Sequence, residues 1–292
     1  MILSNLQGRV EKNYPLRTLS TWRIGGPAEY VYWPESWEEV AKAWHAAKEC
    51  GVPIRIIGRG SNLLFPDQGL PGITVVSTAL KNIVWGNYSV RVGAGFSLAL
   101  LAQEVGERGW SGLEFARGIP GTVGGAIIMN AGAHGGEISD RLEKVKVLTE
   151  EGSIQELYKS ELQFGYRESS LREKAWILEA ELSFLAGERE KIIEKMREYL
   201  TKRSSSQPLD LPNAGSVFRN PPGNSAGRLI ESAGWKGKSI GGAQVSPKHA
   251  NFIVNAGGAK ASDILQLISL IQTDIKEKFG VELKPEVQYL SA

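Results

Sequence analysis

The chain is poor in the residues that build disulfides and metal sites. Its 292 residues include one cysteine, Cys50, and only three histidines, His45, His134 and His249. One cysteine cannot form an internal disulfide, and no Cys–His spacing typical of zinc is present, so we expect no metal. No apolar stretch approaches the roughly 20 residues needed to cross a bilayer, and the N-terminus lacks a secretory signal pattern. The sequence therefore predicts a soluble, cytoplasmic protein.

An excess of charge of one sign is also missing. The 34 Lys and Arg residues nearly balance 32 Asp and Glu residues, which gives a formal net charge of +2. Such a balance does not favour binding to nucleic acid or to a membrane surface. The expected partner is a small molecule, and we expect a monomer. With 42% apolar residues, the chain is long enough to form two or three domains.

Glycine, in contrast, is concentrated in one segment. Residues 115–136, FARGIPGTVGGAIIMNAGAHGG, contain seven glycines. Glycine lets backbone N–H groups approach a ligand, and successive N–H groups in turns form concave sites for anions. Flexible linkers combine Gly with Ser, whereas this segment combines Gly with Ile, Val and Met. It predicts a site for a large phosphorylated cofactor, and the alternative is a glycine-rich surface loop without a ligand.

A complete Rossmann fingerprint is absent. Residues 58–63 read GRGSNL and residues 93–98 read GAGFSL, and both have Leu where the third glycine of G-x-G-x-x-G should stand. In the first motif, Arg59, Ser61 and Asn62 place a cation, a hydroxyl and an amide beside the glycines, which suits a pyrophosphate. With the segment 115–136, the glycine clusters predict a cofactor that lies across a domain junction.

The periodicity of apolar residues predicts a mixture of helices and strands. Residues 36–50 form a helix with Ser36 as its N-cap, Glu39 completing a capping box and Gly51 ending it, and a strand follows at 54–57. Together they predict a β-α-β unit ending near residue 77. Further predicted elements are a helix at 97–108 capped by Ser97, a strand at 176–184, a helix from 187 that breaks at SSSQP (204–208), a helix from Ser262 closed by Gly280, and an alternating strand at 281–290. This pattern is α+β.

Two short motifs contain side chains suited to acid–base or charge chemistry. FGYRES, residues 164–169, places Arg167 in a turn, and an arginine can bind a carboxylate through two parallel N–H donors. KPEVQYL, residues 284–290, places Glu286 on the strand face opposite Val287 and Tyr289. The alternatives are a solvated surface arginine and a plain surface acid.

Two further motifs lie in the C-terminal third. NAGSVFRNPPGNSAGR, residues 213–228, places Ser216 after a glycine turn and offers Arg219, Asn220 and Arg228 near a short helix starting at Ser225. SIGGAQVSPKHANFIVN, residues 239–255, joins Lys248 and His249 to an apolar strand. Ser216 lacks a G-x-S-x-G elbow, so a plain turn residue is its alternative.

Taken in order, these motifs resemble the UDP-N-acetylenolpyruvoylglucosamine reductase family of FAD enzymes. The matching segments are TWRIGGPAEY (21–30), IGRGSNLL (57–64), GIPGTVGGAIIMNAGAHGGEI (118–138), FGYRES, NAGSVFRNP, GGAQVSPKHANFIVN and LKPEV (283–287). The resemblance implies an FAD-binding fold of the vanillyl-alcohol-oxidase/PCMH type, with two α+β subdomains and a C-terminal α+β substrate domain. It also implies NADPH-dependent reduction of UDP-N-acetylglucosamine enolpyruvate to UDP-N-acetylmuramate for peptidoglycan.

The resemblance assigns roles to individual residues. Arg167 and Glu286 match active-site residues, and Ser216 matches the proton donor. The residues matched to FAD binding are Arg23, Gly58, Arg59, Gly60, Ser61, Asn62, Gly118, Pro120, Gly121, Thr122, Gly124, Gly125, Asn130 and Ala131. Those assigned to the substrate are Arg219, Asn220, Arg228 and His249. The compact run from Asn220 to Gly241 resembles the shorter type of the family, which lacks an extra tyrosine-bearing segment.

The expected domains are 1–77, 78–203 and 204–283, with the strand 284–292 completing the first. One alternative function is a flavin oxidase of the vanillyl-alcohol-oxidase type, for which His134 is the plausible covalent anchor. Another is a flavin- or nucleotide-binding module without catalysis. That reading leaves Arg167, Ser216 and Glu286 without a role.

Overall fold

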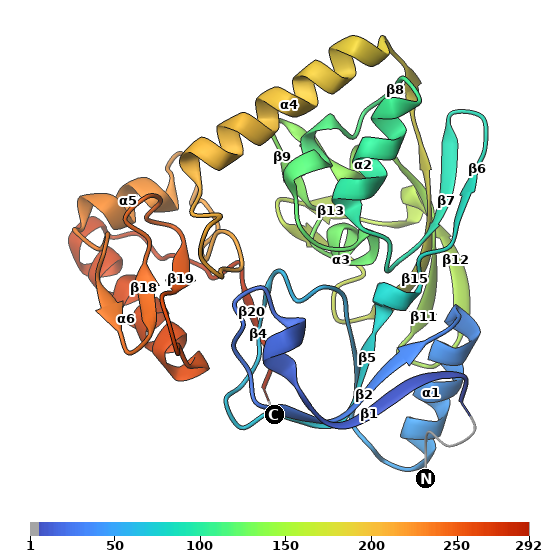
Figure 1. Ribbon diagram of the computed structural model, residues 1–292, viewed down its shortest axis with the longest axis horizontal. Coiled ribbons are helices and arrows are strands. Elements are labelled where there is room, and N and C mark those ends of the chain that lie inside the picture. The colour runs from blue at the N-terminus through green and yellow to red at the C-terminus, as the bar shows by residue number, and fades with distance from the viewer. Residues whose placement is uncertain (1–5, 292) are drawn as a thin grey trace. The chain divides into compact units, whose positions relative to one another are not determined.

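The computed structural model describes residues 6–291. Within them, the chain divides into two compact units, each built from separate stretches of sequence. The first unit consists of 6–12, 30–59 and 72–202, and the second of 13–29, 60–71 and 203–291. Figure 1 shows the course of the chain, coloured by residue number.

Two N-terminal stretches belong to the second unit, although the sequence assigned them to a first domain of residues 1–77. Trp22, Ile24 and Leu64 are buried in the same apolar core as residues from 214 to 287. The indole N–H of Trp22 also donates to the carbonyl of Ile253 at 2.7 Å. Burial of these large side chains explains why 13–29 and 60–71 pack with the C-terminal part.

A four-stranded sheet and one helix build the first part of the first unit, except that residues 13–15, 27–29 and 70–71 at the strand ends are grouped with the second unit. Its strands, in the order β1-β2-β5-β3, are Gly8–Pro15, Pro27–Pro34, Leu70–Val76 and Ile54–Ile57, and α1 is Trp37–Glu49. The Ser36 hydroxyl accepts the N–H of Glu39 at 3.4 Å, so Ser36 is confirmed as the N-cap of α1. The Glu39 carboxylate instead accepts the N–H of Gln7 at 2.8 Å, so the predicted capping box is not formed. The predicted strand at 54–57 is also confirmed, and it pairs in parallel with β5.

The second part of the first unit is a five-stranded antiparallel sheet. Its strands, in the order β12-β11-β15-β7-β6, are Ile154–Tyr158, Leu142–Thr149, Ala175–Ser183, Ser89–Gly93 and Ile83–Trp85. Helices α2 (Leu98–Glu107) and α3 (Val123–Ile128) contribute to its core, and α3 packs against β7 and β15. The predicted helix at 97–108 is confirmed, but the Ser97 hydroxyl makes no cap hydrogen bond.

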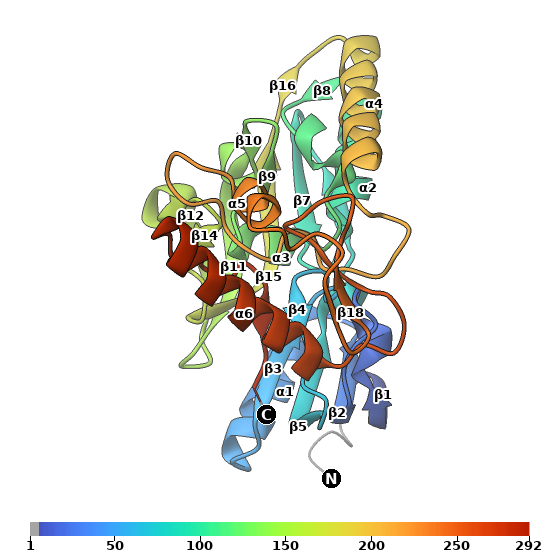
Figure 2. The same cartoon turned by 90° about the vertical axis from the view of Figure 1, so that its left-hand side faces the viewer.

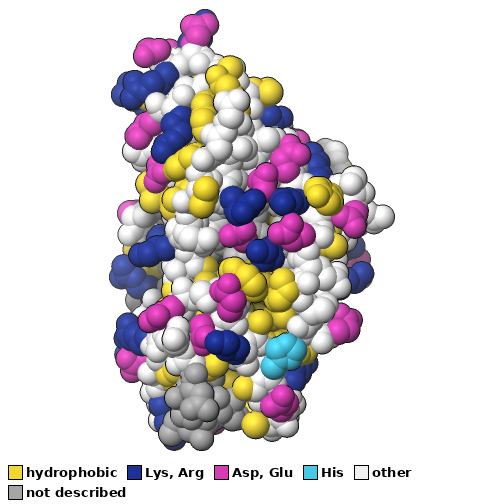
Figure 3. All heavy atoms as spheres, turned by 90° about the vertical axis from the view of Figure 1, so that its right-hand side faces the viewer, with side chains coloured by type: hydrophobic (Ala, Val, Ile, Leu, Met, Phe, Trp, Pro, Cys, Tyr) yellow, Lys and Arg dark blue, Asp and Glu magenta, His cyan; other side chains and the backbone are white. Residues whose placement is uncertain are grey.

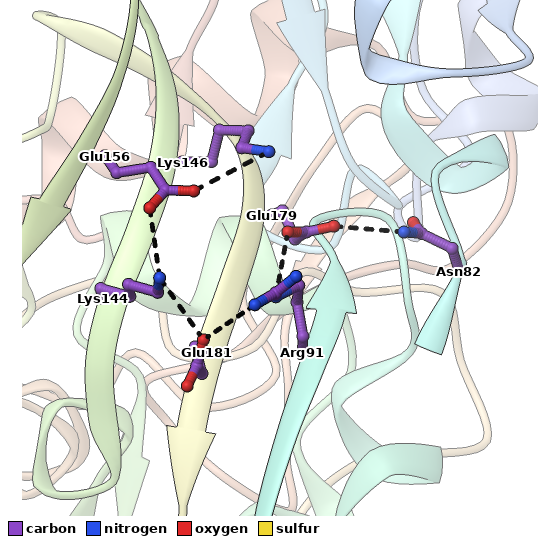
Figure 4. A network of polar contacts seen from close by, with 7 residues as sticks. All are labelled: Asn82, Arg91, Lys144, Lys146, Glu156, Glu179 and Glu181. Atoms are coloured by element: carbon purple, nitrogen blue, oxygen red, sulfur yellow. Dashed lines mark hydrogen bonds and ion pairs between the residues drawn. The ribbon is translucent and has the colours of Figure 1, made fainter. Parts of the chain in front are cut away.

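Alternation along these strands separates an apolar face from a charged one. Val90 and Val92 on β7 are buried, whereas Arg91 between them lies on the other face. There Arg91 contacts Glu179 at 3.7 Å and Glu181 at 3.6 Å, and lysines of β11 extend the network to Glu156 of β12 (Figure 4). Basic and acidic side chains are interspersed on the molecular face drawn in Figure 3, in keeping with the small net charge.

Helix α4 (Arg189–Ser206) continues through the SSS sequence, where the prediction ended it. Serine is tolerated in a final helical turn, and Pro208 is the residue that cannot continue the helix. The remaining short strands of the first unit are β8 (Trp110–Ser111), β9 (Gly132–Ala133), β10 (Gly136–Glu137), β13 (Phe164–Gly165), β14 (Glu168–Ser169) and β16 (Leu185–Ala186).

The second unit packs α6 (Ala261–Phe279) against the sheet β17-β18-β19, whose strands are Ser239–Ile240, Ala243–Val245 and Ile253–Asn255 (Figure 2). Helix α5 (Ala226–Ser232) begins one residue after the predicted start, Ser225, which is its N-cap, and Gly280 ends α6 with φ +68°. Asp67 caps α6 by accepting the N–H groups of Ala261 at 2.7 Å and Ser262 at 3.1 Å.

The predicted strand at 281–290 is wrong over most of its length. Only β20 (Gln288–Tyr289) is a strand, and it pairs in parallel with β4 (Leu63–Leu64). Tyr289 is 42% exposed and does not face the core. Upstream, Pro285 forms an isolated bridge with Phe218, so the segment is held at single points and not in a ladder. No helix within residues 6–291 is long and apolar enough to span a bilayer.

Candidate active site

Ser216 and Glu286 lie on neighbouring segments of the second unit. The N–H of Glu286 donates to the carbonyl of Val217, the residue after Ser216, at 2.7 Å. Two residues further on, the N–H of Arg219 donates to the carbonyl of Lys284 at 2.9 Å. Both Ser216 and Glu286 are half-buried, so each is packed but not sealed from solvent. The structure thus brings together two of the three residues expected to be catalytic.

The turn before Ser216 depends on a glycine. Gly215 has φ +79°, a left-handed conformation that L side chains rarely adopt. Its N–H donates to Oδ1 of Asn213 at 3.0 Å. A glycine turn therefore delivers Ser216 to the start of the segment that pairs with Glu286.

The motif at residues 58–63, which is expected to bind a pyrophosphate, contacts the Glu286 segment. The Asn62 side-chain amide donates to the carbonyl of Glu286 at 3.1 Å, and the Asn62 carbonyl accepts the N–H of Gln288 at 3.0 Å. Gly60 has φ +63°, and a Cβ there would collide with the carbonyl oxygen of Leu19. Asn62 is thus held beside Glu286 and Gly60 against Leu19, all within the second unit.

The residues expected to contact substrate surround the start of α5. Oδ1 of Asn220 accepts the N–H of Ala226 at 3.0 Å, whereas Arg228 is exposed on the helix. A Cβ on Gly227 would lie 3.4 Å from Cε1 of His249, so this histidine faces the first turn of α5. Arg219, which is half-buried, follows the Ser216 segment directly.

A hydrogen bond fixes the tautomer of the neutral His249 ring. Its Nδ1 accepts the N–H of Asn251 at 3.2 Å, so in the neutral ring the proton is assigned to Nε2. Burial lowers the pKa of His249 below its ordinary value, the positive charge of Lys236 lowers it further, and Glu231 opposes both. A neutral His249 at pH 7 offers one N–H donor.

Arg167 belongs to the first unit, at the tip of the hairpin formed by β13 and β14. It has φ +59°, and its guanidinium lies 5.1 Å from the centroid of the Tyr166 ring. Nη2 of Arg167 donates to the carbonyl of Gly132 at 2.7 Å. The arginine is therefore held against the glycine-rich segment that the sequence singled out.

Asn130 supports the same hairpin. Its side chain is fully buried, and Nδ2 donates to Oε2 of Glu137 at 2.8 Å and to the carbonyl of Gly165 at 3.0 Å. Its Oδ1 accepts the N–H of Ser139 at 3.4 Å. These bonds engage the side-chain amide within the protein and attach it to the Arg167 hairpin.

The glycine clusters of the first unit pack against one another. A Cβ on Gly58 would lie 2.6 Å from Oγ1 of Thr122, and one on Gly124 would lie 2.9 Å from Cβ of Ala94. Thr122 caps α3 by accepting the N–H of Gly125 at 3.3 Å, while the N–H of Gly124 bonds to the carbonyl of Ala94 at 2.8 Å. Turns packed this closely present main chain and not side chains, which fits a cofactor with a pyrophosphate.

The remaining residues expected to bind FAD differ in their exposure to solvent. Arg23, Arg59 and Pro120 are exposed, whereas Gly118, Gly121 and Ala131 are half-buried.

His134, the plausible anchor for a covalent flavin, stacks on Tyr199 with 3.9 Å between ring centroids. No group of three His, Cys, Asp or Glu residues in the described part of the chain could hold a metal ion.

Comparisons with known proteins cover nearly the whole chain. Residues 207–290 match the family described as UDP-N-acetylenolpyruvoylglucosamine reductase, C-terminal domain, and residues 28–158 match the FAD binding domain family. The UDP-N-acetylenolpyruvoylglucosamine reductase of Caldanaerobacter subterraneus subsp. tengcongensis is 45% identical over 283 residues, which cover 97% of this chain and 94% of that protein. The enzyme of the same name from Bacillus licheniformis is 46% identical over 286 residues, with the same two coverages.

A solved structure agrees with these matches. The crystal structure of the UDP-N-acetylenolpyruvylglucosamine reductase from Thermus caldophilus is similar with a TM-score of 0.84 at 37% identity. The similarity covers 97% of this chain and 100% of that one.

Proposed function

Because this chain belongs to the UDP-N-acetylenolpyruvoylglucosamine reductase family, we propose that Arg167, Ser216 and Glu286 carry out the substrate half of its reaction. The protein is an FAD-containing oxidoreductase that uses NADPH to reduce UDP-N-acetylglucosamine enolpyruvate to UDP-N-acetylmuramate, a precursor of peptidoglycan. The assignment rests on one hydrogen bond, from the N–H of Glu286 to the carbonyl of Val217 at 2.7 Å. This bond aligns the segments that contain Ser216 and Glu286.

The fold is α+β, with an FAD-binding fold of the vanillyl-alcohol-oxidase/PCMH type and a C-terminal substrate domain. We propose that Gly58, Arg59, Gly60, Ser61, Asn62 and the 118–125 turn bind FAD. The packed glycine turns at Gly58 and Thr122 support this proposal. When bound, FAD supplies the hydride that reduces the substrate double bond.

Arg167 and Glu286 are proposed to stabilise charge that develops during hydride transfer. The substrate is an enol ether conjugated to a carboxylate, so hydride addition at its terminal carbon leaves negative charge on the neighbouring carbon and in the carboxylate. A fixed cation and an acid that donates a hydrogen bond favour this state over the starting substrate. The bond from Arg167 to Gly132 at 2.7 Å gives the cation a fixed position.

Ser216 is proposed to deliver the proton that completes the reaction. A carbanion is a strong base, so a serine hydroxyl within hydrogen-bond reach is acidic enough to protonate it. The O–H bond of Ser216 breaks as the C–H bond forms, and solvent returns a proton to the serine oxygen. The monomeric state and cytoplasmic location expected from the sequence stay predictions.

An anaerobic two-step experiment tests this function against the oxidase alternative. NADPH should bleach the flavin absorbance of the purified protein, and only the enolpyruvyl sugar nucleotide should restore it rapidly. Rapid recovery with oxygen alone would support a flavin oxidase. The comparisons do not favour that alternative, because the relatives named above are all reductases of this substrate class.

A further inference from the structure

Through its side chain, Asn251 makes two hydrogen bonds to the backbone of one residue, Phe218. Its side chain is 4% exposed, its Oδ1 accepts the N–H of Phe218 at 2.9 Å, and its Nδ2 donates to the carbonyl of Phe218 at 2.8 Å. A side-chain amide thus pairs with both backbone groups of Phe218, as a neighbouring strand would. Because Phe218 is 1% exposed, loss of this amide leaves buried backbone groups unpaired.

The main chain of Asn251 holds the preceding residue as well. Its carbonyl accepts the N–H of Val217 at 2.8 Å, while the carbonyl of Val217 accepts the N–H of Glu286 at 2.7 Å. Asn251 therefore contacts both residues after Ser216, on a segment that Glu286 also contacts. No regular ladder fixes this segment among the described residues, because Phe218 pairs with Pro285 only as an isolated bridge.

Loss of the hydrogen bonds from the Asn251 side chain should displace residues 217 and 218, in addition to lowering the stability of the protein. A regular strand shares its register among many ladder bonds, whereas the register of residues 217 and 218 rests on a few contacts, three of them from Asn251. A small misplacement of a reacting group has a large effect on rate, because proton transfer needs hydrogen-bond distance. Ser216, which directly precedes this segment, would move with it.

We propose that Asn251 is the positioning residue for Ser216, holding its hydroxyl in reach of the substrate carbon that takes up a proton. This inference rests on the proposed function of Ser216. It assigns Asn251 no contact with substrate or FAD, so its effect on the reaction passes through the serine.

A double-mutant cycle on the FAD-loaded enzyme tests the proposal. Asn251→Asp is nearly isosteric, and it keeps the acceptor for Phe218 N–H while it removes the donor to Phe218 C=O. With Ser216 present, it should slow reoxidation of the reduced flavin by substrate about tenfold or more, with NADPH reduction within about twofold of normal. In the Ser216→Ala background, the same substitution should change the rate by less than about twofold.

The solvent isotope effect provides a second readout. A displaced proton donor makes proton transfer slower relative to hydride transfer, so the isotope effect on the substrate half-reaction should increase in Asn251→Asp. Asn255→Asp is the matched control, because the Asn255 amide donates to the carbonyl of Trp22 at 3.0 Å and accepts two N–H groups of its own loop. It should lower the urea midpoint without raising the isotope effect.

Equal rate losses in both backgrounds, or an unchanged isotope effect, would overturn the proposal for Asn251. Full turnover by Ser216→Ala would instead overturn the proposed function of Ser216. If Asn251→Asp does not fold, Asn251→Ala is measured in the same cycle with the same expected results. The two failures are therefore distinguishable.

Discussion

Asn130 and Arg167 each hydrogen-bond the main chain of the other's segment. The Asn130 amide donates to the carbonyl of Gly165 at 3.0 Å, and the Arg167 guanidinium donates to the carbonyl of Gly132 at 2.7 Å. The Ser169 hydroxyl also donates to the carbonyl of Ile128 at 2.9 Å, so three side chains link the hairpin and the glycine-rich segment. The orientation of Arg167, the arginine proposed to be catalytic, is therefore determined by the segment expected to bind FAD.

Substitution of Arg167 should affect only one half of the reaction. Arg167→Lys keeps the charge and loses the planar donor fork, so substrate reduction should slow by about 10²-fold or more, the effect typical of a lost charge-stabilising donor. Flavin reduction by NADPH should stay near normal, since it involves no charge on the substrate. Stopped-flow measurement of the two half-reactions checks this.

Arg91→Lys, on the charged face of the sheet, is the matched control for this substitution. It should leave both half-reactions unchanged, because Arg91 contacts only Glu179 and Glu181 among the ion pairs described. Equal losses in both half-reactions of Arg167→Lys would indicate a folding or flavin defect instead.

Loss of the Ser216 hydroxyl should stop turnover after flavin reduction. In Ser216→Ala, NADPH should reduce FAD at a near-normal rate, and the variant should still bind substrate. Its turnover should nearly stop, because the carbanion lacks a proton donor. Ser216→Cys should keep more activity than Ser216→Ala, since a thiol also donates a proton. In heavy water, the normal product should carry deuterium at the carbon next to the carboxylate.

A bulky side chain at Gly121 should prevent FAD binding. Gly121 has φ +128°, and its carbonyl accepts the N–H of Leu98 at 3.3 Å, so Gly121→Leu strains the turn that precedes α3. The ratio of flavin to protein absorbance after purification should decrease sharply. Gly135→Leu is the control and should leave this ratio unchanged, because Gly135 also has a positive φ, is not among the residues expected to bind FAD, and has nothing within 4 Å of its Cβ position.

The flavin should also be non-covalent. Acid precipitation should leave a colourless pellet and release FAD into the supernatant. A yellow pellet would contradict non-covalent binding and direct attention to His134, whose ring stacks on Tyr199.

Protonation of His249 should destabilise the second unit. Burial lowers the pKa of His249 in the folded protein, so the unfolded chain binds this proton more readily. The neutral His249 ring therefore makes its full contribution to the free energy of unfolding at pH values above about 6.5, the pKa of histidine in the unfolded chain. This contribution decreases as the pH falls below that value. The urea midpoint of the normal protein should fall more steeply below about pH 6.5 than that of His249→Gln. Identical pH profiles would show that this ring does not titrate on unfolding.

The sequence predicts elements whose signals are local. Helices α1 and α6 follow from apolar periodicity together with Ser36 and Gly280 at their ends, and Arg167, Ser216 and Glu286 stand out through motif resemblance. The roles of Asn130 and Asn251 could not be predicted, because each amide pairs with backbone groups that are distant in sequence. Asn130 also has a backbone φ of +41°, and no local sequence pattern predicted this left-handed conformation.

The three-part division of the second unit has a consequence for how the protein forms on the ribosome. All stretches of the first unit have been synthesised by residue 202, so it is able to collapse while the chain is still growing. Trp22 and Asn62 must wait for partners at Ile253 and Glu286, which emerge last. Contacts between residues so far apart in sequence form slowly. The first unit therefore folds before Ser216 and Glu286 reach their positions in the second unit.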